Sequence, residues 1–168
     1  MLRVLVGHAG DEVFARLLAA SGELDPIARV ELRAPAFSIE RELERPFLRA
    51  SAVVDERDGV EGFCLTWLVA DEAHVLDVLT LPWARGRGVG RIVLDAALDD
   101  ARARGARVAL LEVRRSNEAA LALYERRGFL GYNVRAAYYD DGEDALELVC
   151  PLEPGSADGF APFVPLRR

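Results

Sequence analysis

A glycine-rich loop in the middle of the chain has the composition of an anion-binding site. The loop consists of Arg85, Gly86, Arg87, Gly88, Val89 and Gly90, and an amphipathic helix is expected from Arg91 onward. Unpaired N–H groups and the positive end of the helix dipole meet at a helix N-terminus, and glycine lets the backbone approach a ligand closely. Arg85, Arg87 and Arg91 form a local positive cluster. The loop predicts a phosphate site; the alternative is a purely structural glycine turn.

Two well-known phosphate-binding motifs do not fit this loop. A dinucleotide fingerprint needs a glycine at its sixth position, but counting from Gly86 puts Arg91 there, and counting from Gly88 puts Val93 there. A Walker A loop needs lysine, and all 21 basic residues of this chain are arginine. The absence of lysine also excludes a lysine nucleophile and a Schiff-base lysine.

Glu112 is a strand carboxylate that the residues alone leave with two interpretations. It shares a strand face with Val108 and Leu110, so we expect partial burial to raise the pKa of its carboxyl and make it a better proton acceptor near neutral pH. The alternative is a strand-end glutamate paired with Arg114 or Arg115. No metal-ligand spacing and no Gly-x-Ser-x-Gly elbow accompanies it, so metal and serine-nucleophile mechanisms have no support in the sequence.

The elements that position these residues follow from the hydrophobic periodicity. The expected strands are residues 2–6, 51–55, 60–69, 74–81, 108–113, 129–139 and 145–152. The expected helices are residues 11–20 stopped by Gly22, 38–45 with Ser38 as N-cap, 91–104, and 117–127 capped by Ser116. Residues 51–81 read as an antiparallel meander. The helix at 91–104 is a crossover, so the strands on either side of it should run parallel. The fold class is therefore α/β (α+β), with helices on the faces of a mixed sheet.

Composition limits the organisation and the partners of the chain. At 168 residues and 51% hydrophobic content, one domain over residues 1–152 is expected, followed by a tail at 153–168 that is flexible or docked. A net charge of -7 should repel nucleic acids and anionic membranes. The chain has no apolar run long enough for a membrane span or a signal peptide, which predicts a cytoplasmic protein. Cys64 and Cys150 lie in apolar, strand-like segments and are expected to be unpaired.

Several motifs together resemble the GNAT superfamily of acyl-CoA-dependent N-acetyltransferases. Arg85-x-x-Gly88-x-Gly90, after a strand that ends at Leu81, is similar to the loop that wraps the cofactor pyrophosphate in that superfamily. The stretches 111–120 (LEVRRSNEAA) and 123–129 (LYERRGF) resemble one subfamily, the bacterial ribosomal-protein-alanine N-acetyltransferases (RimI-type), and Tyr138-Tyr139 resembles that subfamily's C-terminal hairpin. The resemblance covers about residues 53–152, whereas residues 1–33 and the tail do not match the expected pattern.

The resemblance implies the fold, the cosubstrate and the roles of the site residues. It implies a largely antiparallel GNAT-type sheet with helices on both faces, and acetyl-CoA as cosubstrate with no metal. Glu112 would be the general base, Tyr124 the general acid and Asn117 a cofactor contact. The backbone of Leu79, Thr80 and Leu81 would bind pantetheine, and residues 85–91 the pyrophosphate. Leu79-Thr80-Leu81 departs from the usual small-residue, Val, Asp sequence, a change that preserves backbone contacts and alters the side chains beside the thioester.

The acceptor implied by the resemblance is the N-terminal α-amine of a protein, such as a ribosomal protein. An α-amine has a pKa near 8, roughly two units below lysine, so a single carboxylate acting through water suits it. One alternative is a small amine or an antibiotic as acceptor on the same scaffold, because fold and cofactor motif do not determine the acceptor. Another is a non-catalytic acyl-CoA-binding regulator, against which the presence of both Glu112 and Tyr124 argues. For Tyr124 taken alone, a core tyrosine is the alternative.

Overall fold

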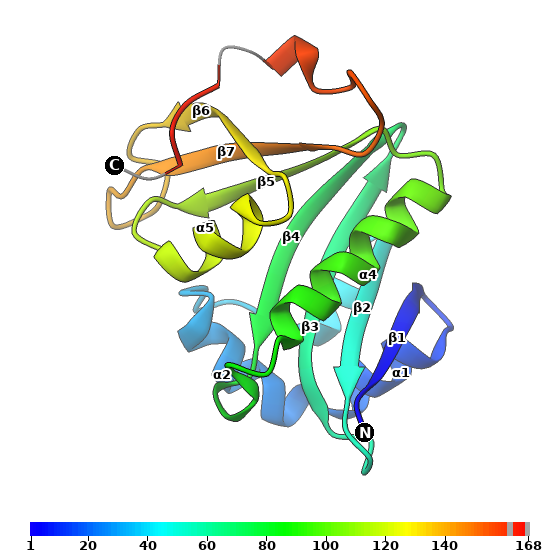
Figure 1. Ribbon diagram of the computed structural model, residues 1–168. Helices are drawn as coiled ribbons and strands as arrows, with labels where there is room; N and C mark the ends of the chain where they lie inside the picture. Colours follow the sequence, from blue (N-terminus) through cyan, green and yellow to red (C-terminus); the bar gives the residue numbers. More distant parts are fainter. Residues whose placement is uncertain (161–162, 167–168) are drawn as a thin grey trace. The chain divides into compact units, whose positions relative to one another are not determined.

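The computed structural model describes residues 1–160 and 163–166, which fall into two compact units. The first unit contains Met1–Leu68 and Val75–Asp100, and the second contains Val69–His74 and Ala101–Arg168. The strands follow the order β1-β2-β3-β4-β5-β7-β6, and β4 (Glu72–Thr80) contributes residues to both units (Figure 1). The predicted mixed sheet with helices is confirmed.

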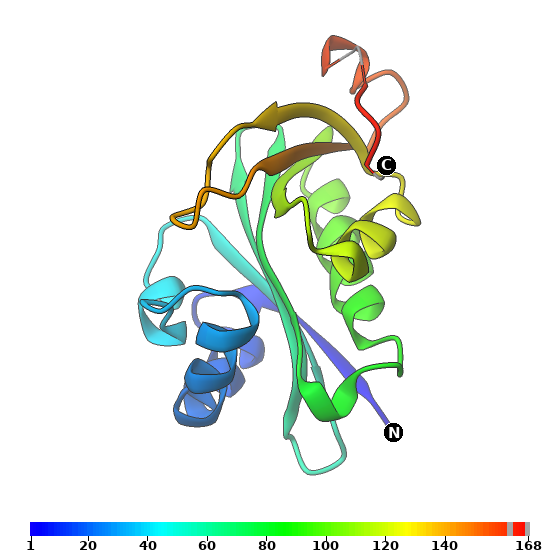
Figure 2. The ribbon, with the colours of Figure 1, turned by 90° about the vertical axis from the view of Figure 1, so that its left-hand side faces the viewer.

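The first unit is a sheet covered by helices on both faces. Its remaining elements are β1 (Arg3–His8), α1 (Glu12–Ala19), α2 (Ser21–Glu31), α3 (Ile39–Leu43), β2 (Leu48–Val54), β3 (Val60–Val69), the short helix η1 (Pro82–Ala84) and most of α4 (Val89–Ala103). β2 pairs antiparallel with β1 and with β3. Helices α1 to α3 lie on one face of these strands and α4 on the other (Figure 2).

Helix α4 is anchored to the sheet by its apolar stripe and by two polar contacts. Val93, Leu94, Ala97 and Leu98 recur at helical spacing and are buried. The hydroxyl of Ser51 donates to the carbonyl of Val93 at 2.6 Å, and Arg49 forms an ion pair with Asp100. These contacts set where the N-terminus of α4, with the glycine-rich loop before it, lies relative to β2.

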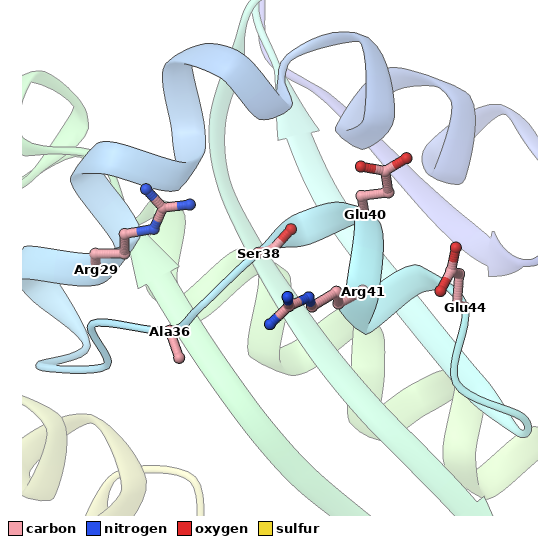
Figure 3. Close-up of a pocket in the computed structure, with 6 residues that line it drawn as sticks. All are labelled: Arg29, Ala36, Ser38, Glu40, Arg41 and Glu44. Carbon is pink, nitrogen blue, oxygen red and sulfur yellow. The ribbon is translucent and has the colours of Figure 1, made fainter.

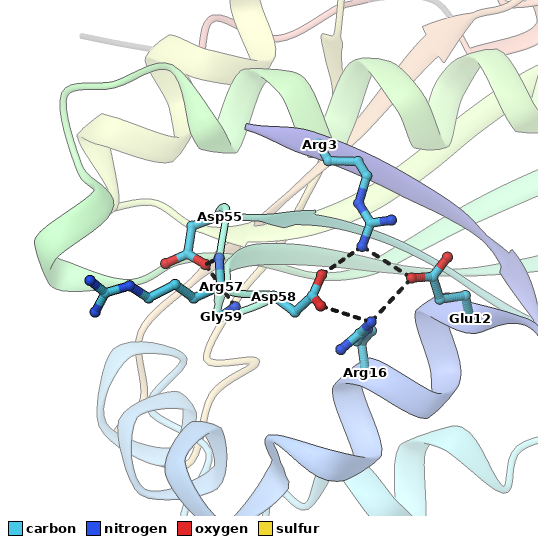
Figure 4. A network of polar contacts seen from close by, with 7 residues as sticks. All are labelled: Arg3, Glu12, Arg16, Asp55, Arg57, Asp58 and Gly59. Atoms are coloured by element: carbon cyan, nitrogen blue, oxygen red, sulfur yellow. Dashed lines mark hydrogen bonds and ion pairs between the residues drawn. The ribbon is translucent and has the colours of Figure 1, made fainter. Parts of the chain in front are cut away.

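The N-terminal strand and helix are tied to the β2–β3 turn by a charged network. Arg3 Nη2 lies 2.7 Å from Asp58 Oδ1 and 3.1 Å from Glu12 Oε1, and Arg16 contacts the same two carboxylates (Figure 4). In the turn itself, Asp55 accepts from the N–H groups of Arg57 and Gly59. The paired charges are exposed, so the network orients this end of the unit more than it stabilises it.

The second unit holds the strand, helix and final strand pair that were predicted from residue 108 onward. It contains β5 (Val108–Arg114), α5 (Glu118–Glu125), β6 (Leu130–Arg135), β7 (Ala145–Pro151) and the short helix η2 (Asp158–Phe160). β4 pairs parallel with β5 between Glu72 and His74, as the crossover predicted, and β7 pairs antiparallel with both β5 and β6. Cys64 in the first unit and Cys150 here are buried free thiols.

The chain after residue 152 packs on the second unit where the structure describes it. Ala157 is buried in a small core with Val108 and Val149, and Phe160 packs edge-on against Tyr132 with ring centres 4.9 Å apart. The N–H of Val164 donates to the carbonyl of Gly131 at 2.6 Å. Residues 161–162 and 167–168 of the predicted tail lie outside the described residues.

One local prediction was wrong because tertiary packing overrode a local signal. Gly22 does not stop the first helix: α1 ends before Ala20, and α2 begins at Ser21 and contains both Gly22 and Pro26. Burial of Leu24 and Ala28 holds this unexpected helix in place.

The predicted helix boundaries around the site also shift. The N-cap of α5 is Asn117, whose side chain accepts from the N–H of Ala120 at 3.2 Å, instead of Ser116. Ser38 does precede α3, but its side chain makes no capping hydrogen bond. β6 ends at Arg135, four residues short of the prediction, and the residues that follow form a loop whose Tyr139, Asp141 and Glu143 contact Arg114 at the C-terminal end of β5.

Candidate active site

The predicted phosphate loop has the backbone of an anion site. Gly86 and Gly88 have φ values of +73° and +78°, a left-handed conformation that other residues adopt only with strain. A side chain built on either glycine would meet no atom within 4 Å, so the space beside the backbone is open. α4 begins at Val89, two residues earlier than predicted, so Val89 and Gly90 belong to its first turn. The N–H groups of that turn have no partner within the helix and can donate to a ligand.

The positive cluster predicted for this loop is largely neutralised. Arg85 forms an ion pair with Glu31 of α2, and Arg87 Nη1 lies 2.6 Å from Glu61 Oε2 on β3. Arg91 is exposed on α4. The prediction counted only arginines near each other in sequence, whereas the two glutamates lie 54 and 26 residues away from their partners. The backbone donors, more than the net charge, make this loop suited to phosphate.

The strand end before the loop is positioned by Glu61 and Gly62, two residues that the sequence reasoning missed. The N–H of Leu81 donates to the carbonyl of Glu61 at 3.0 Å. A Cβ on Gly62 would lie 2.6 Å from the carbonyl oxygen of Leu79 and 2.7 Å from a methyl of Val89. A glycine inside an apolar strand signals such a close approach. Together these two residues of β3 hold the predicted pantetheine edge, Leu79 to Leu81, against the start of α4.

Asp77 is a second carboxyl group that the sequence reasoning missed. It lies on β4, two residues before Leu79, and burial raises the pKa of its carboxyl to about 6. The negative charge of Glu42 raises this pKa further, and Arg45 opposes the rise. Arg45 is itself paired with Glu42 and stacked over Trp67 at 5.2 Å. A carboxyl that titrates near neutral pH is a feature of acid–base sites, although structural groups show it too.

The predicted burial of Glu112 is wrong. Its side chain is 41% exposed, and its Oε1 accepts from Arg135 Nη1 at 3.1 Å. The face that it shares with Val108 and Leu110 is buried at Val108, partly exposed at Leu110 and open at Glu112. Its partner is Arg135 of β6, whereas the sequence suggested Arg114 or Arg115 as the alternative.

Arg114 instead holds the loop between β6 and β7. Its guanidinium stacks on Tyr139 at 3.8 Å and contacts Asp141 and Glu143 at 2.8 and 2.9 Å. Glu143 also accepts from the N–H of Ser116, and these hydrogen bonds lower the pKa of the Glu143 carboxyl. The loop is therefore tied to the end of β5 and to the connection that follows it.

Tyr124 and Asn117 lie at opposite ends of α5. Tyr124 is buried, and its ring packs against Phe129 with centres 5.5 Å apart. The oxygen of Asn117 is occupied by the cap of α5, so its contribution to a ligand would come from its NH₂ group. The predicted site residues thus fall in both units: residues 79–91 in the first, and Glu112, Asn117 and Tyr124 in the second.

A surface hollow of about 580 Å³ in the first unit contains none of the predicted site residues. It is lined by Arg29, Ala36, Ser38, Glu40, Arg41 and Glu44 (Figure 3). Two arginines and two glutamates leave it without a net charge that would favour a phosphate. Among the described residues, no group of three His, Cys, Asp or Glu side chains could hold a metal ion, and no helix has the length and apolarity to cross a bilayer.

Comparison with known proteins defines the class of this enzyme. Residues 16–129 match the Acetyltransferase (GNAT) family, and the chain belongs to that family of acetyltransferases. The match starts upstream of the resemblance drawn from the motifs, so the expectation that residues 1–33 fall outside the pattern is wrong from residue 16 onward.

The similar proteins include ribosomal-protein-alanine N-acetyltransferases and an antibiotic acetyltransferase. The chain is 36% identical over 109 residues to the [ribosomal protein bS18]-alanine N-acetyltransferase of Salmonella typhimurium, an alignment that covers 63% of this chain and 72% of that one. The crystal structure of the ribosomal-protein-S18-alanine N-acetyltransferase from Escherichia coli superposes with a TM-score of 0.71 at 29% identity, over 91% of this chain and 95% of that one. A nourseothricin acetyltransferase superposes with a TM-score of 0.60 at 32% identity, over 64% and 67% of the two chains.

Proposed function

We propose that this enzyme transfers the acetyl group of acetyl-CoA to the N-terminal α-amine of a protein, and that the acceptor is a ribosomal protein. The observation that carries the proposal is the likeness to ribosomal protein bS18-alanine N-acetyltransferases in both sequence and fold. The net charge of -7 also favours a basic acceptor.

In the proposed complex, acetyl-CoA binds along the end of β4 and the glycine-rich loop. The N–H groups at the start of α4 donate to the pyrophosphate, and Gly86 and Gly88 allow the backbone to approach it. The backbone from Leu79 to Leu81 pairs with the pantetheine arm, and the NH₂ group of Asn117 donates to the cofactor. The open space beside both glycines supports this arrangement.

In the proposed reaction, Glu112 accepts a proton from the α-amine through a water molecule. The neutral amine attacks the thioester carbonyl, and the tetrahedral intermediate collapses with cleavage of the carbon–sulfur bond. Tyr124 donates its hydroxyl proton to the departing thiolate. The proton that the attacking nitrogen loses as the amide forms passes through water to the Tyr124 oxygen, so that the products are the acetylated N-terminus and free CoA. The exposure of Glu112 suits a base that must meet a solvent-borne amine.

A panel of acceptors tests this proposal. We expect a peptide that begins with alanine to be acetylated on its α-amine, as read by mass spectrometry. The same peptide with a blocked N-terminus and an internal lysine should react poorly, because a lysine amine holds its proton about two pKa units more tightly. Equal turnover of the blocked peptide would contradict N-terminal specificity and indicate acetylation of lysine side chains.

A second candidate acceptor is an antibiotic amine. The 32% identity to a nourseothricin acetyltransferase favours including it. Nourseothricin should therefore be assayed beside the peptides under the same conditions. A kcat/KM for nourseothricin above that for the alanine peptide would indicate that the acceptor is an antibiotic and not a protein.

A further inference from the structure

Arg135, the last residue of β6, contacts three groups at once. Its Nη1 lies 3.1 Å from Oε1 of Glu112 and 3.7 Å from Oε1 of Glu147, and its guanidinium carbon lies 4.4 Å from the centre of the Tyr138 ring. These contacts come from β5, from β7 and from the loop after β6. Arg135 therefore links Glu112, the proposed base, to β7 and to the loop after β6.

The two carboxylates that Arg135 contacts would repel each other without it. Glu112 and Glu147 are direct cross-strand partners in the antiparallel pair of β5 and β7. Like charges at directly opposite positions disfavour each other, and an intervening guanidinium removes that repulsion. Glu147 also accepts from the side-chain amide of Asn133 at 2.5 Å, which fixes its orientation independently. The orientation of the Glu112 side chain therefore depends on Arg135 more than the orientation of Glu147 does.

Arg135 also connects Glu112 to the loop between β6 and β7. The ring of Tyr138, on which Arg135 stacks, packs edge-on against Tyr139 with centres 5.1 Å apart. Tyr139 in turn lies under Arg114 of β5. The planar guanidinium of arginine can make an ion pair and a ring stack at once, whereas an ammonium group cannot do both in the same way.

We propose that Arg135 is a positioning residue for acetyl transfer, which orients the Glu112 carboxylate by pairing with it while stacked on Tyr138. This inference rests on the proposed function, in which Glu112 is the base. The pair is exposed, with the side chains 46% and 41% accessible, and exposed ion pairs contribute little to folding stability. Loss of Arg135 should therefore change the orientation of Glu112 and leave the fold intact.

Steady-state kinetics of Arg135→Gln and Arg135→Lys test the inference. We expect Arg135→Gln to lower kcat by roughly tenfold, because a misoriented base loses its geometric advantage, with the KM for acetyl-CoA changed less than twofold. Arg135→Lys keeps the charge without the stack, so its kcat should lie between those of Arg135→Gln and wild type. Arg126→Gln makes the same charge change at the exposed C-terminal end of α5 and should retain wild-type kcat.

A double-mutant cycle separates positioning from a general structural effect. If Arg135 acts through Glu112, Arg135→Gln should have no further effect on kcat in a Glu112→Gln background. An equal loss of kcat in both backgrounds, or wild-type kcat in Arg135→Gln, would overturn the inference.

An NMR measurement tests whether Arg135 pairs with Glu112 without relying on enzyme activity. The Nε–Hε signal of Arg135 should shift on Glu112→Gln and stay unchanged on Glu118→Gln, a change on α5. If wild type acetylated none of the acceptors, the proposed function would fall, while this signal would still establish or refute the pairing of Arg135 with Glu112. An unchanged Arg135 signal in Glu112→Gln would refute it.

Discussion

Arg87 Nη1 of the glycine-rich loop lies 2.6 Å from Oε2 of Glu61, a carboxylate buried on β3. The two partners differ in their exposure: the Glu61 side chain is 8% accessible and that of Arg87 is 47% accessible. The pair therefore matters mainly for Glu61, because a buried carboxylate without its partner is costly.

Removing Arg87 should consequently destabilise the protein more than removing its neighbour Arg85. We expect Arg87→Gln to lower the free energy of unfolding by about 1–3 kcal/mol, since the buried Glu61 side chain would lose its ion-pair partner. Arg85→Gln leaves the more exposed Glu31 in contact with water and should cost less than about 1 kcal/mol. Urea denaturation of both variants at pH 7 measures the difference. Equal losses would show that Glu61 is not held by Arg87 in solution.

Gly62→Ala should weaken acetyl-CoA binding although residue 62 is not part of the loop. The new methyl group would collide with the carbonyl of Leu79 and with Val89, so the strand end or the start of α4 must shift. Overpacking of this kind costs about 1–3 kcal/mol of stability. Isothermal titration calorimetry should show a Kd for acetyl-CoA raised about tenfold. Gly22→Ala is the matched control, because a Cβ there meets nothing within 4 Å. A folded Gly62→Ala protein with wild-type Kd would contradict the assignment of this edge to the cofactor.

The proposed base and acid should respond differently to pH. Glu112→Gln removes basicity, so turnover should fall most at low pH, where the amine is protonated, and recover partly as pH rises past the amine pKa near 8. Tyr124→Phe removes the proton donor for the thiolate and should lower kcat by roughly 10- to 1000-fold at every pH. Full pH–rate profiles of both variants measure the difference. Wild-type turnover by both across the range would make them structural residues, with catalysis resting on positioning alone.

Asp77 should make the stability of the protein depend on pH. Burial raises the pKa of its carboxyl from 3.8 to about 6, so the folded state binds this proton more tightly than the unfolded state. The resulting stabilisation is complete below about pH 4 and is lost as pH rises through 6. Asp77→Asn abolishes this titration. Its unfolding free energy relative to wild type should therefore increase by up to about 3 kcal/mol between pH 4 and pH 7 and then level off.

Denaturation curves at several pH values measure this difference. Asp140→Asn removes one negative charge at an exposed position and serves as the control. A difference between Asp77→Asn and wild type that stays constant from pH 4 to pH 7 would show that Asp77 is not buried in solution.

The sequence alone determined the elements around the site and the class of chemistry. The turn into α4 needs glycines at positive φ, and the apolar stripe of α4 repeats at helical spacing, so both are visible in consecutive residues. The parallel pairing of β4 with β5 followed from the crossover helix between them. The pattern around Glu112, Asn117 and Tyr124 lies on one strand and the next helix, which is why a resemblance could be drawn from it.

Only the tertiary structure decided which charges meet and which side chains are buried. Helix α2 formed despite Gly22 and Pro26 because Leu24 and Ala28 found a core to pack against. Glu112 turned out exposed and paired with Arg135, a residue 23 positions away on another strand. Periodicity determines which face of a strand a residue occupies, but not which distant residue lies within a few ångströms of it. Ion pairs, close approaches such as Gly62 to Leu79, and the burial that shifts a pKa depend on that distance.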